Sequence, residues 1–342
     1  MSSGQPKPFL DDSGSPLSGS VSEKIRVRVN GVPQGMIIKG RDARNPVLLY
    51  LHGGMPDHFL TRRYPTGLEE DFTVVWWDQR GSGLSYSPRI PPETVTTEQL
   101  VADTLALTDH LRRRFGQEKI YLMGHSGGTF IGIQAAALAP ASYHAYIAVA
   151  QMSYQLRSEK LAYDYMLGRF KEAGDARMVR RLEKAPVTMA VPLPGPYLSV
   201  RDVAMHRLGI GTTHDMRSIV RGLFVPSLLF PEYTLREKFG LWRGKLFSRK
   251  RLWDTQLATD LSTVVGGLDL PVYFCHGAYD YTVSYPGARS YFQRLEAPVK
   301  GFYTFRRSAH SPLFEEPRRM CEIMRGDVLT GKTGLADDDG QG

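Results

Sequence analysis

The 342-residue sequence has only two cysteines, Cys275 and Cys321, and no apolar run long enough to span a membrane. Two cysteines cannot build a disulfide framework or a cysteine-rich metal site, which favours a reducing, cytoplasmic location. A membrane-spanning helix needs about 20 apolar residues, so we expect none. The first residues also lack the basic and apolar segments of a signal peptide. No metal-binding or dinucleotide-binding motif stands in a suitable context, so we expect no metal and no cofactor.

Acidic residues are scarce in one long segment. Between Gln155 and Ser262 the sequence has 19 Lys and Arg against 11 Asp and Glu, whereas the rest of the chain is neutral. Helical spacing interrupted by prolines indicates a basic helical insertion there. Its charge fits either a solvated helical face or attraction of anionic substrates. Because no nucleic-acid-binding motif accompanies the charge, we do not expect nucleic acid as a partner.

Short apolar runs elsewhere alternate with helical patterns. Residues 46–51 and 72–77 are continuous apolar runs, typical of strands covered on both faces. Apolar side chains at helical spacing predict a helix over 97–115. After the basic segment, 271–275 and 301–305 again have the pattern of buried strands. This alternation predicts an α/β fold with a mostly parallel central sheet and helices on both faces.

The same patterns divide the chain into a core, an insertion and two end segments. We assign residues 21–154 and 263–330 to the α/β core and 155–262 to an inserted helical lid above the carboxyl edge of the sheet. Residues 1–20 are rich in Ser, Gly and Pro, and residues 331–342 are polar. We expect both end segments to be disordered.

A possible nucleophile lies between a predicted strand and a predicted helix. Gly124-x-Ser126-x-Gly128 follows the strand pattern at 119–123 and precedes an Ala-rich helical pattern. A nucleophile elbow needs this context, because small residues must flank a serine on so sharp a turn. The alternative is a glycine-rich packing turn without chemistry. We interpret Ser126 as a nucleophile at a helix N-terminus, where free amides stabilise negative charge.

Serine needs a general base and an acid that orients it. His310 follows the strand pattern at 301–305, and Asp280 follows the one at 271–275, so both lie at the carboxyl edge of the sheet. Of the other histidines, His276 at a strand end is more typical of a structural role, and His52 of a residue that orders the glycine loop beside it. We therefore predict that Ser126, Asp280 and His310 form a catalytic triad.

An oxyanion hole needs two backbone donors near the reacting carbonyl. The amide of Gly127, directly after the nucleophile, is one. The second should come from the loop His52-Gly53-Gly54-Met55-Pro56, which follows a predicted strand. We choose Gly54 for it, and its neighbour Met55 stays open as an alternative.

With these residues identified, the sequence resembles the α/β-hydrolases, and among them the proline iminopeptidase-like group of peptidase family S33. His52-Gly53-Gly54-Met55-Pro56 resembles the family's HGGPG loop. Residues 78–85, with the sequence DQRGSGLS, are similar to its DQRGxGxS signature. Residues 124–128, GHSGG, occupy its nucleophile elbow. The resemblance covers roughly residues 24–329, more weakly across the lid, and implies an α/β-hydrolase fold.

The sequence departs from that group in its substrate-contacting segments. Met55-Pro56 replaces Pro-Gly in the loop, and Gly127 stands where iminopeptidases usually carry Trp. Iminopeptidases hold the free amine of the substrate with acidic lid residues, and in this basic lid Glu232 is one candidate. A surface or helix-start carboxylate is the alternative interpretation of Glu232. We take Met55, His125 and Glu232 as candidate substrate-binding residues, although His125 could instead pack beside the elbow.

These observations predict a cofactor-independent serine hydrolase that cleaves an amide or ester bond through an acyl-enzyme, as proline iminopeptidases do. A carboxylesterase or lactonase acting on a small apolar or anionic substrate is an alternative within hydrolysis. It predicts an apolar pocket, which Phe224, Leu228, Leu229, Phe230 and Trp242 could supply. A non-catalytic ligand-binding protein with the same fold is the alternative from another class. The expected partner is a small molecule or short peptide.

Overall fold

The computed structural model describes residues 2–338. Over this range the chain forms one eight-stranded sheet in the order β1-β2-β4-β3-β5-β6-β7-β8. Strands β1 and β2 pair antiparallel, as do β2 and β4, and all later neighbours pair in parallel. The strand bounds are β1 (Val21–Val29), β2 (Val32–Gly40), β3 (Val47–Leu51), β4 (Thr73–Trp77), β5 (Ile120–His125), β6 (Tyr143–Val149), β7 (Val272–Gly277) and β8 (Lys300–Phe305).

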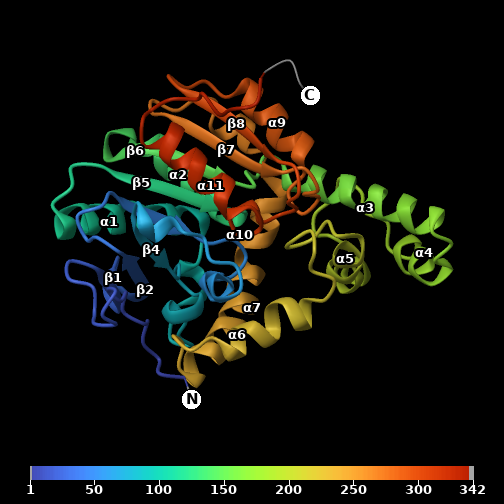
Figure 1. Ribbon diagram of the computed structural model, residues 1–342. Coiled ribbons are helices and arrows are strands. Elements are labelled where there is room, and N and C mark those ends of the chain that lie inside the picture. Colours follow the sequence, from blue (N-terminus) through green and yellow to red (C-terminus); the bar gives the residue numbers. More distant parts are fainter. Residues whose placement is uncertain (1, 339–342) are drawn as a thin grey trace.

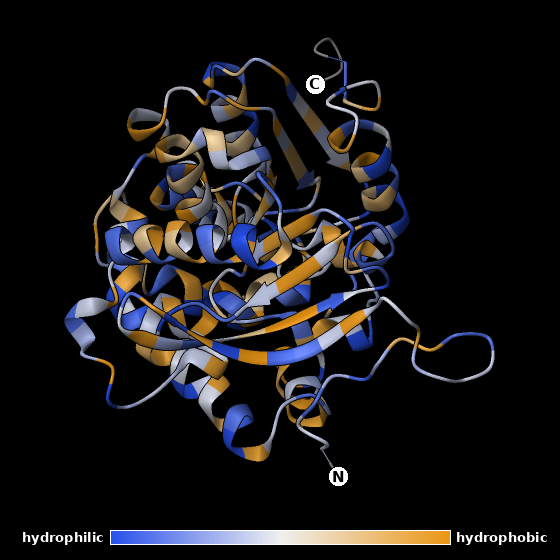
Figure 2. Ribbon diagram, turned by 90° about the vertical axis from the view of Figure 1, so that its left-hand side faces the viewer, coloured by the Kyte–Doolittle hydropathy of each residue, from blue (hydrophilic) through white to orange (hydrophobic). Residues whose placement is uncertain are grey.

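The helices of the core lie on both faces of the sheet (Figure 1). One face packs against α1, α2 and α9 through a first apolar cluster, and the other packs against α10 and α11 through a second. Figure 2 shows helices that carry both hydrophilic and hydrophobic residues. The predicted α/β-hydrolase layering is confirmed. The bounds are α1 (Thr97–Phe115), α2 (Gly127–Leu138), α9 (Tyr285–Arg294), α10 (Pro312–Glu315) and α11 (Pro317–Ile323).

Local sequence explains where several of these elements begin and end. Asn30 and Gly31 join β1 to β2 with φ values of 43° and 81°, and such positive values suit the twist of a two-residue hairpin. Thr96 caps α1 by accepting a hydrogen bond from the Gln99 amide at 3.2 Å. The Gln99 side chain bonds to Asp103 at 2.9 Å and does not complete the capping box. The last α-helix, α11, ends at Ile323, and the chain continues as a wider π-helical turn over Met324–Val328.

All the named elements between β6 and β7 are helices. They span the segment that we assign to the lid, residues 155–262. Figure 1 shows α3, α4 and α5 projecting beyond one end of the sheet, and α6 and α7 running beside its lower part. A third apolar cluster, separate from the two around the sheet, joins α3, α4 and α5. The bounds are α3 (Gln155–Glu172), α4 (Ala176–Glu183), α5 (Gly195–Leu208), α6 (Val225–Leu229), α7 (Leu235–Ala258) and α8 (Leu261–Val264).

The end segments differ from the expectation of disorder wherever the structure describes them. The Gly4 amide donates to the Pro231 carbonyl at 3.0 Å, which fastens the N-terminal segment to the lid. Near the other end, the Asp337 amide donates to the carbonyl of Phe302 at 2.8 Å. Polar composition suggested disorder, but these backbone hydrogen bonds give both segments partners in the fold. Residues 1 and 339–342 lie outside the described residues.

A buried ion pair joins the loop after β4 to the first core helix. Arg80 donates from Nε to Asp103 Oδ2 at 2.6 Å and from Nη2 to Oδ1 at 2.8 Å. Asp103 also accepts hydrogen bonds from Gln34 and Asn30 of the β1–β2 hairpin. Both partners of the pair are almost inaccessible to solvent, with side-chain exposures of 2% and 0%. The pair therefore fixes the hairpin, the loop and α1 to one another.

We expect Arg80→Met to lower the free energy of unfolding by about 3–5 kcal/mol, because it leaves the Asp103 carboxylate buried without its counter-charge. Urea unfolding followed by circular dichroism measures the loss. Arg169→Met is the matched control, since Arg169 pairs with Glu172 where both side chains are more than half exposed. That control should cost less than about 1 kcal/mol. Equal losses in the two variants would contradict a structural role for the buried pair.

Candidate active site

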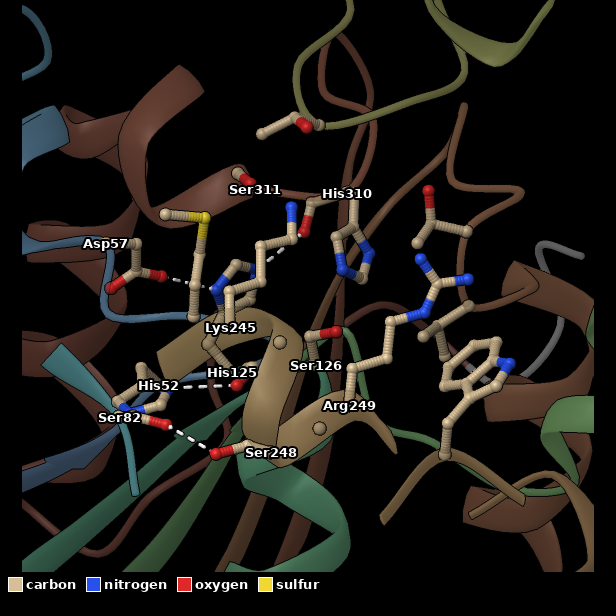
Figure 3. A pocket seen from close by; sticks show the side chains of 18 of the residues that line it. His52, Asp57, Ser82, His125, Ser126, Lys245, Ser248, Arg249, His310 and Ser311 are labelled. Carbon is tan, nitrogen blue, oxygen red and sulfur yellow. Dashed lines mark hydrogen bonds and ion pairs between the residues drawn. The ribbon is translucent and has the colours of Figure 1, made fainter. Parts of the chain in front are cut away.

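A cavity of about 260 Å³ lies at the carboxyl edge of the sheet, beneath α7 of the lid. Its lining includes Ser126 from the β5–α2 turn, His310 from the segment after β8, and the glycine loop after β3. Figure 3 shows the Ser126 hydroxyl and the His310 ring facing the same space. Segments far apart in the sequence thus meet where the sequence placed the catalytic residues.

The backbone at Ser126 has the conformation of a nucleophile elbow. Its φ of 55° and ψ of −123° lie outside the ordinary regions for a residue with a side chain, at a cost of about 1–3 kcal/mol. The turn is held by the Ser126 amide, which donates to the Val149 carbonyl at 2.9 Å, and by the Ser126 carbonyl, which accepts from the Thr129 amide at 2.8 Å. A Cβ on Gly128 would lie 2.1 Å from the Leu51 carbonyl oxygen, so only glycine fits there.

The loop after β3 packs directly against this turn. A Cβ on Gly53 would lie 2.7 Å from the Ser126 Cβ, so the loop backbone is in contact with the serine. Among residues 2–338 the amides of Gly54, Met55 and Gly127 have no hydrogen-bond acceptor. These free donors are what an oxyanion hole requires. The choice of Gly54 with Gly127 remains a prediction, with Met55 as the neighbouring alternative.

His52 orders the glycine loop, the role favoured from the sequence. Its Nε2 accepts from the Gln79 amide at 3.2 Å, so its Nδ1 carries the proton and donates to the Gly53 carbonyl at 2.8 Å. The Gln79 side chain donates to the His52 carbonyl at 2.7 Å. Burial lowers the pKa of His52 to about 4, against the opposing charge of Asp57. A neutral His52 is therefore a fixed part of the loop.

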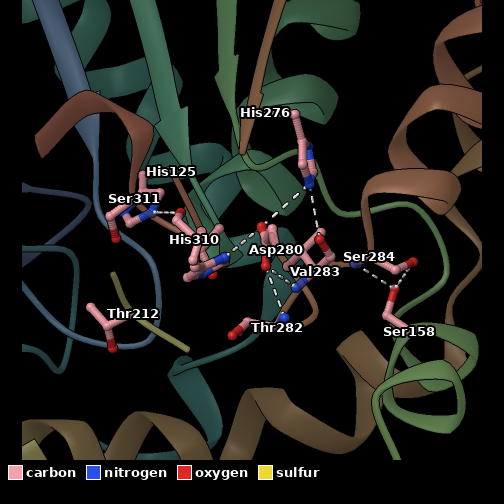
Figure 4. A network of polar contacts seen from close by, with 12 residues as sticks. His125, Ser158, Thr212, His276, Asp280, Thr282, Val283, Ser284, His310 and Ser311 are labelled. Atoms are coloured by element: carbon pink, nitrogen blue, oxygen red, sulfur yellow. Dashed lines mark hydrogen bonds and ion pairs between the residues drawn. The ribbon is translucent and has the colours of Figure 1, made fainter. Parts of the chain in front are cut away.

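His310 and Asp280 form a buried pair. His310 Nδ1 donates to Asp280 Oδ2 at 2.9 Å, which leaves Nε2 as the unprotonated nitrogen of a neutral ring. The other carboxylate oxygen, Oδ1, accepts from the amides of Thr282 and Val283 at 2.8 and 3.0 Å, as Figure 4 shows. His276 Nε2 contacts Val283 and the Asp280 carboxylate, at 2.9 and 3.3 Å. His276 is thus structural and steadies the acid.

The pKa values of this pair suit a base that is neutral near pH 7. Burial lowers the pKa of His310 below its ordinary 6.5, although the Asp280 carboxylate works in the opposite direction. Burial would raise the pKa of Asp280, but the His310 charge and the hydrogen bonds from His276 and His310 outweigh it and hold that pKa well below its usual range. Asp280 is therefore ionised, and His310 is free to accept a proton.

Within the described chain the Ser126 hydroxyl has no hydrogen-bond partner. Ser126 and His310 line the same cavity without a hydrogen bond between them. Catalytic hydrogen bonds of this kind commonly tighten only in the complex with substrate. The arrangement supplies a hydroxyl at a strained turn, a neutral imidazole with a buried carboxylate behind it, and free amides. Such a set can perform acyl transfer.

Carboxylates also hold the loop that carries His310. Glu315 accepts from the Ala309 and Ser311 amides at 2.9 and 3.3 Å, on either side of the histidine. A Cβ on Gly277 would lie 1.8 Å from the Ala309 carbonyl oxygen, so β7 and this loop meet backbone to backbone. The sequence analysis did not identify these supports, because they act between segments that are distant in sequence.

Both ring nitrogens of His125, a candidate substrate-binding residue, have partners within the protein. Its Nδ1 lies 2.9 Å from Asp57 Oδ2 and its Nε2 lies 2.9 Å from the His310 carbonyl oxygen. Both nitrogens face acceptors, so both donate and the ring is a cation. Burial would lower the pKa of His125, but the hydrogen bond and charge of Asp57 outweigh it and raise the pKa. Although His125 lines the cavity, it leaves no polar atom free for a substrate.

Glu232 lies outside the cavity lining, whereas Met55 is part of it. Glu232 is buried and pairs with His58 Nε2 at 3.0 Å and with Lys39 at 3.4 Å. His58 lies in the short helical turn after β3 and Lys39 lies on β2, so both partners of the carboxylate belong to the core. The position of Glu232 therefore does not support the expectation that it holds a substrate amine. The sequence alone did not show which way its side chain faces.

The apolar lining also differs from the residues that the sequence suggested. Phe224, Leu228 and Leu229 are exposed on the outside of the lid, and Phe230 and Trp242 pack in the second apolar cluster. None of these five lines the cavity. The apolar lining includes instead Met152, Met205, Ile219, Leu223, Leu252 and Trp253.

Charged residues that the sequence analysis did not single out reach the same cavity. They are Asp57, Arg80, Arg201, Asp202, Lys245 and Arg249. The last two lie four positions apart on α7, and that spacing was the one signal available in the sequence.

Residues 2–338 contain no group of three or more His, Cys, Asp or Glu side chains placed to hold a metal ion. No helix in this range is both long and apolar enough to cross a membrane. Cys275 is buried and Cys321 is half-buried, and both are free thiols.

Comparison with known proteins places this chain in a family. A family model described as serine aminopeptidase, S33, matches residues 65–181. A probable aminopeptidase, YbaC of Bacillus subtilis (strain 168), is 32% identical over 311 residues, which cover 88% of this chain and 95% of that protein.

Solved structures share the fold at lower identity. Proline iminopeptidase of Mycobacterium smegmatis has a TM-score of 0.62 at 15% identity, with 90% of this chain and 98% of that chain covered. A thermophilic esterase of Thermogutta terrifontis has a TM-score of 0.56 at 16% identity, with 91% and 100% covered. At such identities these structures support the fold alone.

We expect Gly53→Ala to slow the reaction of Ser126 with a fluorophosphonate probe by about 100-fold, because the new methyl group displaces the serine from its position in the elbow. The second-order labelling rate measures this effect. Gly168→Ala makes the same chemical change on α3, where a Cβ meets open space, and should label at the wild-type rate. Normal labelling of a folded Gly53→Ala protein would show that this contact does not position the nucleophile.

Proposed function

This chain belongs to the serine aminopeptidase family S33 of the α/β-hydrolases, and we propose that it cleaves an amide or ester bond through an acyl-enzyme formed on Ser126. The observation that carries the proposal is that Ser126, on its strained turn, shares one cavity with a His310 ring oriented by buried Asp280. A packing turn without chemistry would need no such pair. Membership of a hydrolase family also argues against a purely ligand-binding role.

In the proposed mechanism the Ser126 hydroxyl attacks the substrate carbonyl and His310 Nε2 takes its proton. The carbonyl oxygen becomes an oxyanion, which the amides of Gly54 and Gly127 stabilise. His310 then gives the proton to the leaving group as the carbon–leaving group bond breaks. A water molecule, deprotonated by His310, attacks the acyl-enzyme, and the proton returns to Ser126 as the acid is released. Asp280 stabilises the imidazolium in each half of the cycle.

A fluorophosphonate probe should label wild-type protein on Ser126 alone, and Ser126→Ala should abolish the label. Because burial lowers the pKa of His310, the base stays neutral as the pH falls to 6.5. The labelling rate should therefore decline with a midpoint below pH 6.5, where His310 becomes protonated. Peptide mapping locates the label, and rates between pH 4 and 8 give the midpoint. A label on another residue, or a midpoint above 6.5, would argue against this assignment.

The finer proposal is an aminopeptidase, similar to proline iminopeptidases, that acts on short peptides. Such an enzyme needs an acceptor for the substrate ammonium. Asp202 of α5 replaces Glu232 as the candidate, because it lines the cavity and its side chain is about half exposed (47%). It lies 2.7 Å from Arg201 Nη1, and that contact leaves the second carboxylate oxygen for a ligand.

A carboxylesterase or lactonase is the second candidate, and the apolar lining of the cavity favours it. Met152, Met205 and Leu252 provide a surface suited to an acyl chain without an amine. The two candidates differ in what they require of the substrate: an aminopeptidase needs the free amine, and an esterase does not.

We expect proline p-nitroanilide to be cleaved with a kcat/KM at least about tenfold above that of N-acetylproline p-nitroanilide, because acetylation removes the cation that Asp202 would bind. Initial rates for this pair, together with p-nitrophenyl butyrate and a small lactone, provide the measurement. Ser126→Ala is the background control. Rapid cleavage of the butyrate ester or the lactone, with neither anilide hydrolysed, would reject the aminopeptidase in favour of the second candidate.

A further inference from the structure

One face of α7 forms a wall of the cavity along several helical turns. The residues on this face follow the helical repeat of 3.6 residues. Near its C-terminal end, a Cβ on Gly127 would lie 3.5 Å from the Gln256 side-chain nitrogen, so this end of α7 covers the nucleophile elbow. Figure 3 shows Lys245 and Arg249 extending from α7 into the cavity. In chain order the wall consists of Lys245, Ser248, Arg249, Leu252, Trp253 and Gln256.

Close backbone contact holds this wall in place. A Cβ on Gly244 would lie 2.9 Å from the Gly81 carbonyl oxygen, so α7 rests directly on the loop after β4. The Ser248 hydroxyl donates to the same carbonyl at 3.1 Å and lies 3.2 Å from the Ser82 hydroxyl. The helix positions of Lys245 and Arg249 are therefore fixed relative to the catalytic residues.

Most charges in the cavity wall are already balanced by the protein. Arg80 pairs with Asp103, and Arg201 pairs with Glu159 and with Asp202. Asp57 forms an ion pair with His125.

Lys245 and Arg249 are the exceptions, since within residues 2–338 neither forms an ion pair with a carboxylate. Each instead lies over an indole ring, Lys245 at 5.3 Å from the Trp242 centroid and Arg249 at 5.9 Å from that of Trp253. Within residues 2–338 the cavity thus has two cations that no carboxylate contacts directly.

The titration of Lys245 agrees with this imbalance. Burial lowers its pKa, the charges of Arg249 and Arg201 lower it further, and Asp202 opposes them. Lys245 is half-buried and Arg249 is exposed. Like charges that lie close together destabilise one another, and an anion between them would relieve the repulsion.

We propose that Lys245 and Arg249 bind a carboxylate of the substrate, at the end remote from the bond that is cleaved. The inference rests on the proposed function, under which the anion that a short peptide brings is its C-terminal carboxylate. Arg249 precedes Gln256 by seven residues, which is about 10 Å along the helix axis. Leu252 and Trp253 lie between them and contribute apolar surface to the cavity. The preferred substrate is therefore elongated, with an apolar middle and a terminal negative charge.

Two matched ligand pairs test the proposal, each differing only in the negative charge. The tetrapeptide Pro-Leu-Leu-Ala and its amide Pro-Leu-Leu-Ala-NH2 compare turnover, because three extended residues place the terminal charge about 10 Å from the bond after proline. The acid 4-phenylbutyrate and its amide 4-phenylbutyramide compare binding by calorimetry without any reaction. We expect the carboxylate member of each pair to be favoured by about 10- to 100-fold in kcat/KM or in affinity, since hydrogen bonds to charged groups are worth that much. Equal values within both pairs in the wild-type protein would overturn the proposal.

Two double variants assign the preference to these side chains. In Lys245→Met/Arg249→Met the ratio within each pair should fall to about one. Arg243→Met/Lys250→Met removes the same charge from exposed positions of α7 outside this cavity wall, and it should keep the wild-type ratio. A ratio that persists in the first variant, or that collapses equally in the second, would reject specific recognition by Lys245 and Arg249.

The two readouts also separate this inference from the proposed function. If the probe fails to label Ser126 and no ester, anilide or peptide is cleaved, the acyl-enzyme proposal is wrong. The binding pair still decides whether Lys245 and Arg249 recognise a carboxylate. If Ser126 is labelled and neutral substrates are cleaved, but charge has no effect on binding or turnover, only the inference about the anion fails.

Discussion

The strained turn at Ser126 is the constraint on which the rest of the site depends. A φ of 55° at a serine persists only where neighbouring segments leave the backbone no alternative. Here β3, its following loop and the start of α2 approach one another at backbone contact distance, which Gly53 and Gly128 make possible. The same approach leaves the amides of Gly54 and Gly127 free beside the hydroxyl. The same packing thus sets the geometry of the proposed nucleophile and of the proposed oxyanion donors.

Buried polar pairs surround that turn, and each nearby histidine has its own hydrogen-bond partners there. His52 is neutral and orders the glycine loop, and His125 is held as a cation by Asp57. His276 steadies the Asp280 carboxylate. His310 is left as the ring with an unengaged nitrogen facing the cavity. Burial makes every unpaired polar atom costly, so the network holds each ring in one orientation and leaves one nitrogen of His310 open to the cavity.

The core and the lid contribute different properties to the enzyme. The sheet and its loops hold the groups that would make and break bonds, and these are shared with a family whose members include aminopeptidases. The lid supplies most of the charge and apolar surface that a substrate meets, chiefly from α5 and α7. Through Gly244 and Ser248, α7 rests on the loop after β4, so the lid helix that lines the cavity is in direct contact with the core that carries the proposed catalytic groups.

The sequence by itself determined the alternating strands and helices, the elbow at Ser126, and the order in which acid and base follow it. These features depend on short segments, such as a strand ending in GHSGG, whose local chemistry is sufficient to indicate their conformation. Only the tertiary structure decided where lid side chains point. Glu232 had a suitable charge and a suitable segment, but it faces His58 and Lys39 because helix rotation and packing depend on contacts between distant parts of the chain. For the same reason, the four-residue spacing of Lys245 and Arg249 showed that they share a face of α7 but not that this face meets the cavity, which depends on the close approach of Gly244 to Gly81.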